Sequence, residues 1–235
     1  MARIVKEADE RRAELLDAAR SLFFERGYEG TSVNAIIERI GVSKGAFYHY
    51  FDSKEDLLDA LVERLTDEAV ALTQPIIEQD GLSALERLNR FFATLRGWKA
   101  EQMPLMMAVM RGIYRDENLA LRHKMMERNA ERMAPLLARL VAAGVEEGVL
   151  DTAHPALAGE MVLRVGAAFS DMAAGLILRV SEHPENVGLL REKITMYQDA
   201  IERVLGAPSG ALALIDDGFL RALQDASGPE QEVGR

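Results

Sequence analysis

The stretch from residue 31 to residue 54 constrains the fold most, because it has the pattern of two short helices joined by a tight turn. The first helix begins after Gly30, where Thr31 or Ser32 is free to cap it, and one of its faces is apolar at helical spacing (Val33, Ile36, Ile37 and Ile40). Gly41 supplies the left-handed backbone that ends this helix, and Ser43 can cap the next one. The pattern predicts a helix-turn-helix.

The second helix of the pair has two distinct faces. Phe47 and Phe51 lie one turn apart and are expected to anchor the helix inward. The opposite face carries small or hydrogen-bonding residues (Lys44, Gly45, Tyr48 and His49). Such side chains can contact phosphates and base edges, so DNA is the first partner that the sequence indicates.

The order and spacing of these residues resemble the DNA-binding domain of the TetR/AcrR family of transcriptional regulators. The matching positions are Gly27-Tyr28, Thr31, Ile36 through Ser43, Gly45, Phe47-Tyr48, Tyr50-Phe51, Lys54 and Leu57. Ile40 stands where the family often has Ala, and Tyr50 where it often has His, which puts one frequent phosphate contact in doubt. The DNA-binding residues that follow from the pattern and the resemblance are Thr31, Ser32, Asn34, Ser43, Lys44, Gly45, Ala46, Tyr48, His49, Tyr50 and Lys54.

A further helix is expected before the pair, ending near Gly27. Its apolar residues Leu15, Ala19, Leu22 and Phe23 repeat at helical spacing within a charged segment, so this helix should brace the pair from behind. Four basic residues precede it: Arg3, Lys6, Arg11 and Arg12. They are compatible with an arm that enters a minor groove, but acidic residues are interleaved with them, which favours a frayed, solvated terminus.

Composition excludes several kinds of site. The 235 residues include no Cys, so disulfides, thiolate metal sites and a Cys nucleophile are excluded, and with no signal-peptide pattern we expect a cytoplasmic protein without a membrane span. The four His residues lack the spacing of a helical metal site, and no phosphate loop or nucleophile elbow appears. We therefore expect no catalytic residues, no metal, no cofactor and no enzymatic activity. The net charge of −10 lies mainly after the first 64 residues, which predicts weak non-specific DNA binding.

The rest of the chain is predicted to be helical, which gives an all-α fold with a larger C-terminal helical bundle. An apolar stripe starts at Leu57 and runs until Pro75 interrupts it. Later helices are expected from Ser83 to Trp98, from Pro104 to Tyr114, and from Glu117 to Val145. The predicted domains are residues 1–54, which bind DNA, and 55–225, which bind an effector and form a dimer. Residues 226–235 are predicted to be a disordered tail.

Seven of the eleven Met residues lie between positions 103 and 133. Methionine adapts its shape, so such a cluster suits a cavity for apolar compounds, although it is equally typical of ordinary core filling. The resemblance adds weight to the first interpretation, since the larger domain of the family typically holds an effector pocket. The predicted ligand-binding residues are Trp98, Met103, Met107, Met110, Arg111, Tyr114, His123, Met126 and Phe169.

Two helices near the C-terminus are predicted at about 155–180 and 190–205, the first of them rich in small residues that allow close helix packing. They either complete a monomer's core or form a four-helix homodimer interface, which is how the resembled family dimerises. The dimer is favoured, because one short recognition helix gives too little specificity for a genome. Beyond Gly210, an additional short amphipathic helix is expected to dock on the body.

The leading hypothesis is a ligand-responsive regulator, most often a repressor in this family, that binds a palindromic operator as a dimer and is released by a small, largely apolar effector. The alternative from another class is a helical small-molecule binding protein or enzyme with a vestigial DNA-binding head. A third hypothesis is a constitutive DNA binder whose larger domain serves only to dimerise.

Overall fold

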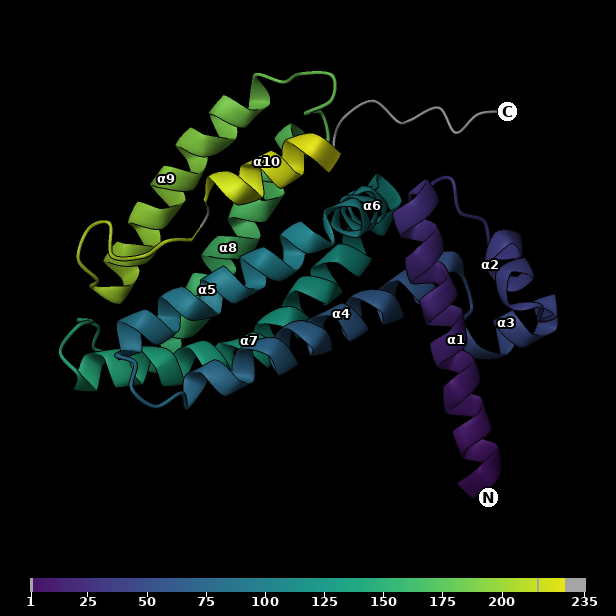
Figure 1. Ribbon diagram of the computed structural model, residues 1–235, viewed down its shortest axis with the longest axis horizontal. Helices are drawn as coiled ribbons and strands as arrows, with labels where there is room; N and C mark the ends of the chain where they lie inside the picture. Colours follow the sequence, from purple (N-terminus) through teal and green to yellow (C-terminus); the bar gives the residue numbers. More distant parts are fainter. Residues whose placement is uncertain (1, 215, 227–235) are drawn as a thin grey trace. The chain divides into compact units, whose positions relative to one another are not determined.

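The structure is a computed structural model that describes residues 2–214 and 216–226, with side chains for residues 9–214 and 216–225 (Figure 1). Every regular element within these residues is helical, which confirms the predicted all-α fold. The elements are α1 (Ala2–Arg26), α2 (Val33–Ile40), α3 (Lys44–Tyr50), α4 (Lys54–Ile77), α5 (Ala84–Glu101), α6 (Met103–Ile113), the short 3₁₀ helix η1 (Asp116–Asn118), α7 (Leu119–Glu146), α8 (Pro155–Ile177), α9 (Asn186–Leu205) and α10 (Asp217–Ala226).

The chain divides into two compact units. The first unit combines Met1–Leu65 with Pro104–Met125, and the second combines Thr66–Met103 with Met126–Arg235. Both α4 and α7 begin in the first unit and continue into the second. The predicted domain boundary after residue 54 stays a prediction. In the division by compactness, residues 55–65 and 104–125 belong to the same unit as the N-terminal helices. The predicted tail lies outside the described residues except for Ala226, which ends α10.

The predicted inward stripe of α1 forms the centre of the first unit. Leu15, Ala19, Leu22 and Phe23 are all buried. However, α1 begins at Ala2, so the expectation of a frayed terminus before it is wrong. Alanine, glutamate, arginine and lysine favour helix, and the ion pair between Arg11 and Glu14, at 2.5 Å, adds support at i, i+3 spacing. The side chains of Arg3 and Lys6 lie outside the described part of the chain.

The second unit encloses an apolar core built from α4, α5, α7, α8 and α9. Figure 1 shows α8 and α9 running side by side, in agreement with their extensive mutual contacts. Gly159 allows α8 to pack closely on α7, because a Cβ at this position would lie 2.8 Å from the backbone nitrogen of Ala138. The core is completed by apolar side chains of these helices and the loops between them, including Ile77, Leu88, Phe91, Leu137, Leu140, Val141, Leu150, Val162, Ile201, Leu205 and Leu212.

Two of the helix boundaries that differ from those predicted have an evident physical cause. Helix α4 continues through Pro75 to Ile77, because proline removes one hydrogen bond but the helix needs only two further residues to reach its end. Helix α9 begins at Asn186, four residues before the predicted start, and the Asn186 side chain donates to the Leu176 carbonyl at 3.1 Å. This bond ties the start of α9 to the end of α8.

The expected C-terminal amphipathic helix is present as α10, and it docks on α5 (Figure 1). Leu220 and Leu223 are buried. The segment before it is held to α5 by Asn89, whose amide donates to the Ala211 carbonyl and accepts from the Ala213 N–H, both at 2.8 Å. Among the described residues, no helix has the length and apolar character needed to cross a membrane.

Candidate DNA-binding site

The turn between α2 and α3 has the geometry that the sequence predicts. Ser32 caps α2, its Oγ accepting from the Ala35 N–H at 3.1 Å, and Gly41 ends the helix in the left-handed region with φ at 70°. Ser43 then caps α3 by accepting from the Ala46 N–H at 3.2 Å. These three residues define where α3 begins, and thereby which of its side chains face outward.

Two phenylalanines anchor α3. Phe47 and Phe51 are buried, and their ring centroids are 5.9 Å apart. Burying an aromatic side chain of this size stabilises a fold by roughly 1.5–3 kcal/mol. The helix is only seven residues long, so this anchoring, rather than intrinsic helix stability, holds it in place.

The opposite face of α3 is open to solvent. Lys44, Gly45 and His49 are exposed, and Tyr48 is 46% exposed. The Lys44 ammonium lies 5.9 Å from the centre of the Tyr48 ring, while the rings of His49 and Tyr50 meet edge to face at 4.9 Å. A Cβ on Gly45 would meet nothing closer than the Ser43 Oγ at 3.9 Å, so no packing within the protein requires glycine here. This face presents the hydrogen-bonding groups that base and phosphate contacts need.

The remaining predicted DNA contacts fall into two groups. Asn34 is exposed, Ala46 and Tyr50 are half-buried, and Ser32 and Ser43 are exposed although their hydroxyls are already used in capping. For these five residues the DNA contact stays a prediction.

Thr31 and Lys54 form the second group. Thr31 is buried, and its hydroxyl donates to the carbonyls of Leu22 and Gly27, at 3.2 and 2.8 Å. The Lys54 ammonium donates to the carbonyls of Tyr28 and Thr31, at 2.8 and 2.9 Å. Both residues therefore hold the loop between α1 and α2, and the direct DNA contact predicted for them stays a prediction.

Tyr28 and Glu55 are structural residues whose pairing the sequence analysis missed. Tyr28 is buried, its hydroxyl donates to Glu55 at 3.0 Å, and the Lys54 ammonium lies 3.9 Å from its ring centre. Burial, followed by the charge of Glu55, raises the pKa of Tyr28, and burial lowers the pKa of Lys54. Burial also acts to raise the pKa of Glu55, but hydrogen bonds from its own backbone and from Tyr28 outweigh it, so the net shift is downward. The motif includes Tyr28, but it does not show that its partner Glu55 lies 27 residues further along the chain, on α4.

The end of α6 packs against this same cluster, a contact that the sequence does not indicate. A Cβ on Gly112 would lie 2.9 Å from Leu58 Cδ2 and 3.1 Å from the Tyr28 ring, so only glycine allows the observed approach. The Asn118 side chain donates to the Gly112 carbonyl at 2.8 Å, and Arg115 pairs with Glu29. The segment 104–125 is therefore fastened directly to the base of the helix-turn-helix.

The predicted ligand-binding residues are divided between the two units. The first unit holds Met107, Met110, Arg111, Tyr114 and His123, and the second holds Trp98, Met103, Met126 and Phe169. Met103 and Met107 are buried, whereas Arg111 and His123 are exposed. Phe169 stacks on Tyr197 at 4.8 Å, and the Arg122 guanidinium lies 4.6 Å from the Tyr114 ring centre. A ligand site formed by this set stays a prediction.

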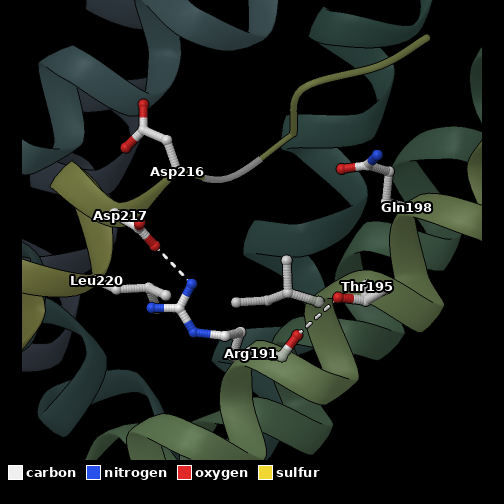
Figure 2. A pocket seen from close by; sticks show the side chains of 7 residues that line it. Arg191, Thr195, Gln198, Asp216, Asp217 and Leu220 are labelled. Carbon is white, nitrogen blue, oxygen red and sulfur yellow. Dashed lines mark hydrogen bonds and ion pairs between the residues drawn. The ribbon is translucent and has the colours of Figure 1, made fainter. Parts of the chain in front are cut away.

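One pocket within the second unit lies elsewhere, between α9 and the start of α10 (Figure 2). Its volume is about 160 Å³, and it is lined by Arg191, Ile194, Thr195, Gln198, Asp216, Asp217 and Leu220. Arg191 bonds to Asp217 at 2.5 Å. The Phe219 N–H has the largest effect and lowers the pKa of Asp216; burial opposes this shift, and the Arg96 guanidinium lowers the pKa further. Five of the seven residues that line this pocket are polar or charged, unlike the apolar Met-lined cavity that the sequence predicts.

The two helices predicted to dimerise present apolar side chains to solvent. On α8 the exposed residues Leu157, Met161 and Met172 are 62%, 49% and 41% exposed. On α9, Leu189 and Met196 are 45% and 65% exposed. The α8 residues recur at helical spacing and so share one face.

Comparison with known proteins agrees with this geometry. The model of the family described as bacterial regulatory proteins, tetR family, matches residues 15–61. The HTH-type transcriptional repressor KstR2 of Mycobacterium tuberculosis is 30% identical over 152 residues, which are 63% of this chain and 73% of that protein. A TetR-family regulator structure from Pectobacterium atrosepticum superposes with a TM-score of 0.63 at 22% identity, covering 86% of this chain and 98% of that one. The structure of RolR in complex with resorcinol superposes with a TM-score of 0.60 at 21% identity, covering 98% of this chain and all of that one.

The fold and the exposed face of α3 define a helix-turn-helix regulator of transcription. The chain belongs to the TetR family, and it is a DNA-binding transcriptional regulator. The relatives named above are described as transcriptional regulators.

Proposed function

We propose that the protein is a repressor that binds a palindromic operator as a homodimer and is released by a small, largely apolar effector. The observation that carries the DNA-binding part is the outward face of α3, where Tyr48 is 46% exposed on a helix anchored by two buried phenylalanines. A side chain of this size is exposed at little cost when it has an external partner. The repressor role is supported by the similarity to KstR2, which is named as a repressor.

In this proposal, DNA is contacted by side chains near both ends of the outward face of α3. Lys44 donates to a guanine edge or to a phosphate, while Tyr48 and His49 supply a hydroxyl and a ring nitrogen for phosphates or base edges. Gly45 allows the backbone of α3 to approach the groove closely. The cation–π contact between Lys44 and Tyr48 positions both side chains before DNA arrives.

The dimer is proposed to form through α8 and α9. Exposed Leu157, Met161 and Met172 on α8, together with Leu189 and Met196 on α9, give an apolar surface that a second copy would cover. Two-fold symmetry would present two copies of α3 to half-sites about 34–36 Å apart on one side of the duplex. The helix ranges are those of the predicted interface, at about 155–180 and 190–205.

Effector binding is proposed to act, through chain continuity, on the helix-turn-helix formed by α2 and α3, here called the reading head. Helix α4 begins in the first unit and continues into the second, so a tilt of α4 would displace the reading head. The segment 104–125, which carries five of the predicted ligand-binding residues, also contacts Tyr28 and Leu58 at the base of the head. A coupling of about 1–3 kcal/mol between the two sites would be typical. The resorcinol complex of RolR shows that one protein of this fold binds a small aromatic compound.

The test begins with an operator selected by the wild-type protein from fragments of its own genome. Lys44→Ala and Tyr48→Ala should each abolish the discrete complex in a gel shift without changing the helical circular dichroism signal. Arg221→Ala, which removes an exposed arginine on α10 in the second unit, is the control and should bind like the wild type. Normal binding by both α3 variants would refute the assignment of the site.

The effector part is tested separately. Small phenols and short aliphatic acids are titrated into the protein–operator complex, and compounds that release the DNA should also raise the melting temperature of the free protein. Retention of the complex with every compound that binds the protein would favour a constitutive DNA binder, whereas turnover of a compound by a protein without DNA affinity would favour an enzyme.

A further inference from the structure

Five described cations of the first unit that lie away from α3 are neutralised locally. Arg39 pairs with Glu25 at 2.7 Å, Arg64 with Asp17 at 2.8 Å, and Lys124 with Asp59 at 3.0 Å. Arg11 pairs with Glu14 and Arg115 with Glu29. A cation whose charge is already matched by a nearby carboxylate gains less from approaching a DNA phosphate.

Arg12 and Lys44 differ from these cations. Arg12 is exposed, and its guanidinium carbon lies 5.3 Å from the centre of the Phe51 ring, while Lys44 lies over Tyr48. Within the described residues, neither side chain forms an ion pair with a carboxylate. A cation–π contact positions a cation without cancelling its net charge. Because Phe51 is only 2% exposed, its ring is a rigid platform for the guanidinium.

The two cations mark opposite ends of α3. Lys44 is its first residue, and Phe51, under Arg12, is the residue that caps its C-terminus. A seven-residue helix is about 10 Å long, which is comparable with the major-groove width of about 12 Å. With α3 in the groove, a cation at each end comes within reach of the phosphates that border it.

We propose that Arg12, from α1, binds a backbone phosphate at the edge of the groove that α3 enters. The planar guanidinium suits both functions, because it stacks on an aromatic ring and donates two parallel hydrogen bonds to a phosphate. The contact positions α3 and reads no sequence. It rests on the proposed DNA binding by α3, and it gives α1 a direct role in DNA binding beyond bracing the helix pair.

The experiment compares Arg12→Gln with Arg11→Gln. Each variant removes one positive charge from neighbouring positions of α1, but Arg11 is already paired with Glu14. Affinity is measured by fluorescence anisotropy between 50 and 200 mM salt, on a 30-bp duplex carrying the selected operator and on a 30-bp duplex of mixed sequence. For a dimer that loses two phosphate contacts, the slope of log K against log salt should become shallower by about 1.8 with Arg12→Gln. The advantage of the wild type should therefore shrink by about tenfold across this salt range.

Three further readouts separate a phosphate contact from packing on Phe51. Arg12→Gln should weaken both duplexes by the same factor, Arg12→Lys should retain the wild-type slope, and Arg11→Gln should behave like the wild type. An unchanged slope in Arg12→Gln overturns the proposal, and so does a lower melting temperature with an unchanged slope, because that result assigns Arg12 to packing alone. If the wild type and Arg11→Gln bind neither duplex, the proposed DNA binding itself fails.

Discussion

Gly112 is the position where a single methyl group should test the connection between the segment 104–125 and the reading head. In Gly112→Ala, the new Cβ would lie 2.9 Å from Leu58 Cδ2 and 3.1 Å from Tyr28 Cγ. Neither neighbour can move freely, because both are buried and the Tyr28 ring is held by Phe23 at 5.2 Å and by its bond to Glu55. Overpacking of this kind costs about 1–3 kcal/mol. The gain in helix propensity, about 1 kcal/mol, offsets only part of this cost.

Gly97→Ala provides the matched control. Gly97 lies in the interior of α5, and a Cβ there would meet nothing within 4 Å. This variant should therefore show only the helix-propensity gain, up to about 1 kcal/mol. The two variants should differ by about 1–3 kcal/mol in the free energy of unfolding, measured by urea denaturation followed by circular dichroism. Gly112→Ala should also weaken operator binding, because Tyr28 must shift at the base of the head. Equal stabilisation by both substitutions would refute the reasoning.

Three further predictions concern single side chains. Thr31→Val keeps the shape of the side chain but removes its donor to two carbonyls. It should therefore lower the free energy of unfolding by about 1–3 kcal/mol and leave the operator affinity of the folded protein unchanged. A loss of operator affinity at unchanged stability would instead support a direct DNA contact by Thr31. Burial raises the pKa of Tyr197 to about 12. Because the folded state binds the phenol proton more tightly, the free energy of unfolding keeps its full value below the unfolded pKa of about 10 and falls as the pH rises through 12. Tyr197→Phe should therefore flatten the fall in stability over this range and remove one late step from the tyrosine absorbance titration, and an unaltered titration would contradict it. Asp216→Ala removes the carboxylate that caps α10 by accepting from the Phe219 N–H at 2.9 Å. It should lower the free energy of unfolding by about 0.5–2 kcal/mol and make hydrogen exchange in α10 faster than in the wild type. Unchanged exchange would show that docking on α5 alone holds the helix.

Local chemistry explains why the helix-turn-helix could be predicted in detail. The caps at Ser32 and Ser43, the left-handed Gly41 and the inward pair Phe47 and Phe51 are all determined by residues within one or two turns of each other. Helical periodicity also predicted the order of the later helices, and it failed mainly at their ends. Helix ends depend on partners that periodicity does not contain, as shown by the side chain of Asn186 at the start of α9.

The intramolecular hydrogen bonds of Thr31 and Lys54 could not be predicted from the local pattern. Both lie in the family motif, and a hydroxyl or a lysine near a recognition helix is a type of group that contacts DNA. Only the packed structure shows that they satisfy carbonyls in the loop after α1. A motif reports that a residue type is needed at a position, but the reason for that need depends on what surrounds the side chain.

By itself, the sequence determined the all-α fold, the position of the recognition helix and the outward direction of its polar face, because each follows from spacing along a few turns of chain. The tertiary structure decided which polar residues brace the loop, that residues 104–125 fasten to the base of the head through Gly112, and that Arg12 stacks on Phe51. Apart from the bonds of Thr31 to Leu22 and Gly27, these contacts join residues that are tens of positions apart, and their proximity exists only once the apolar faces have packed.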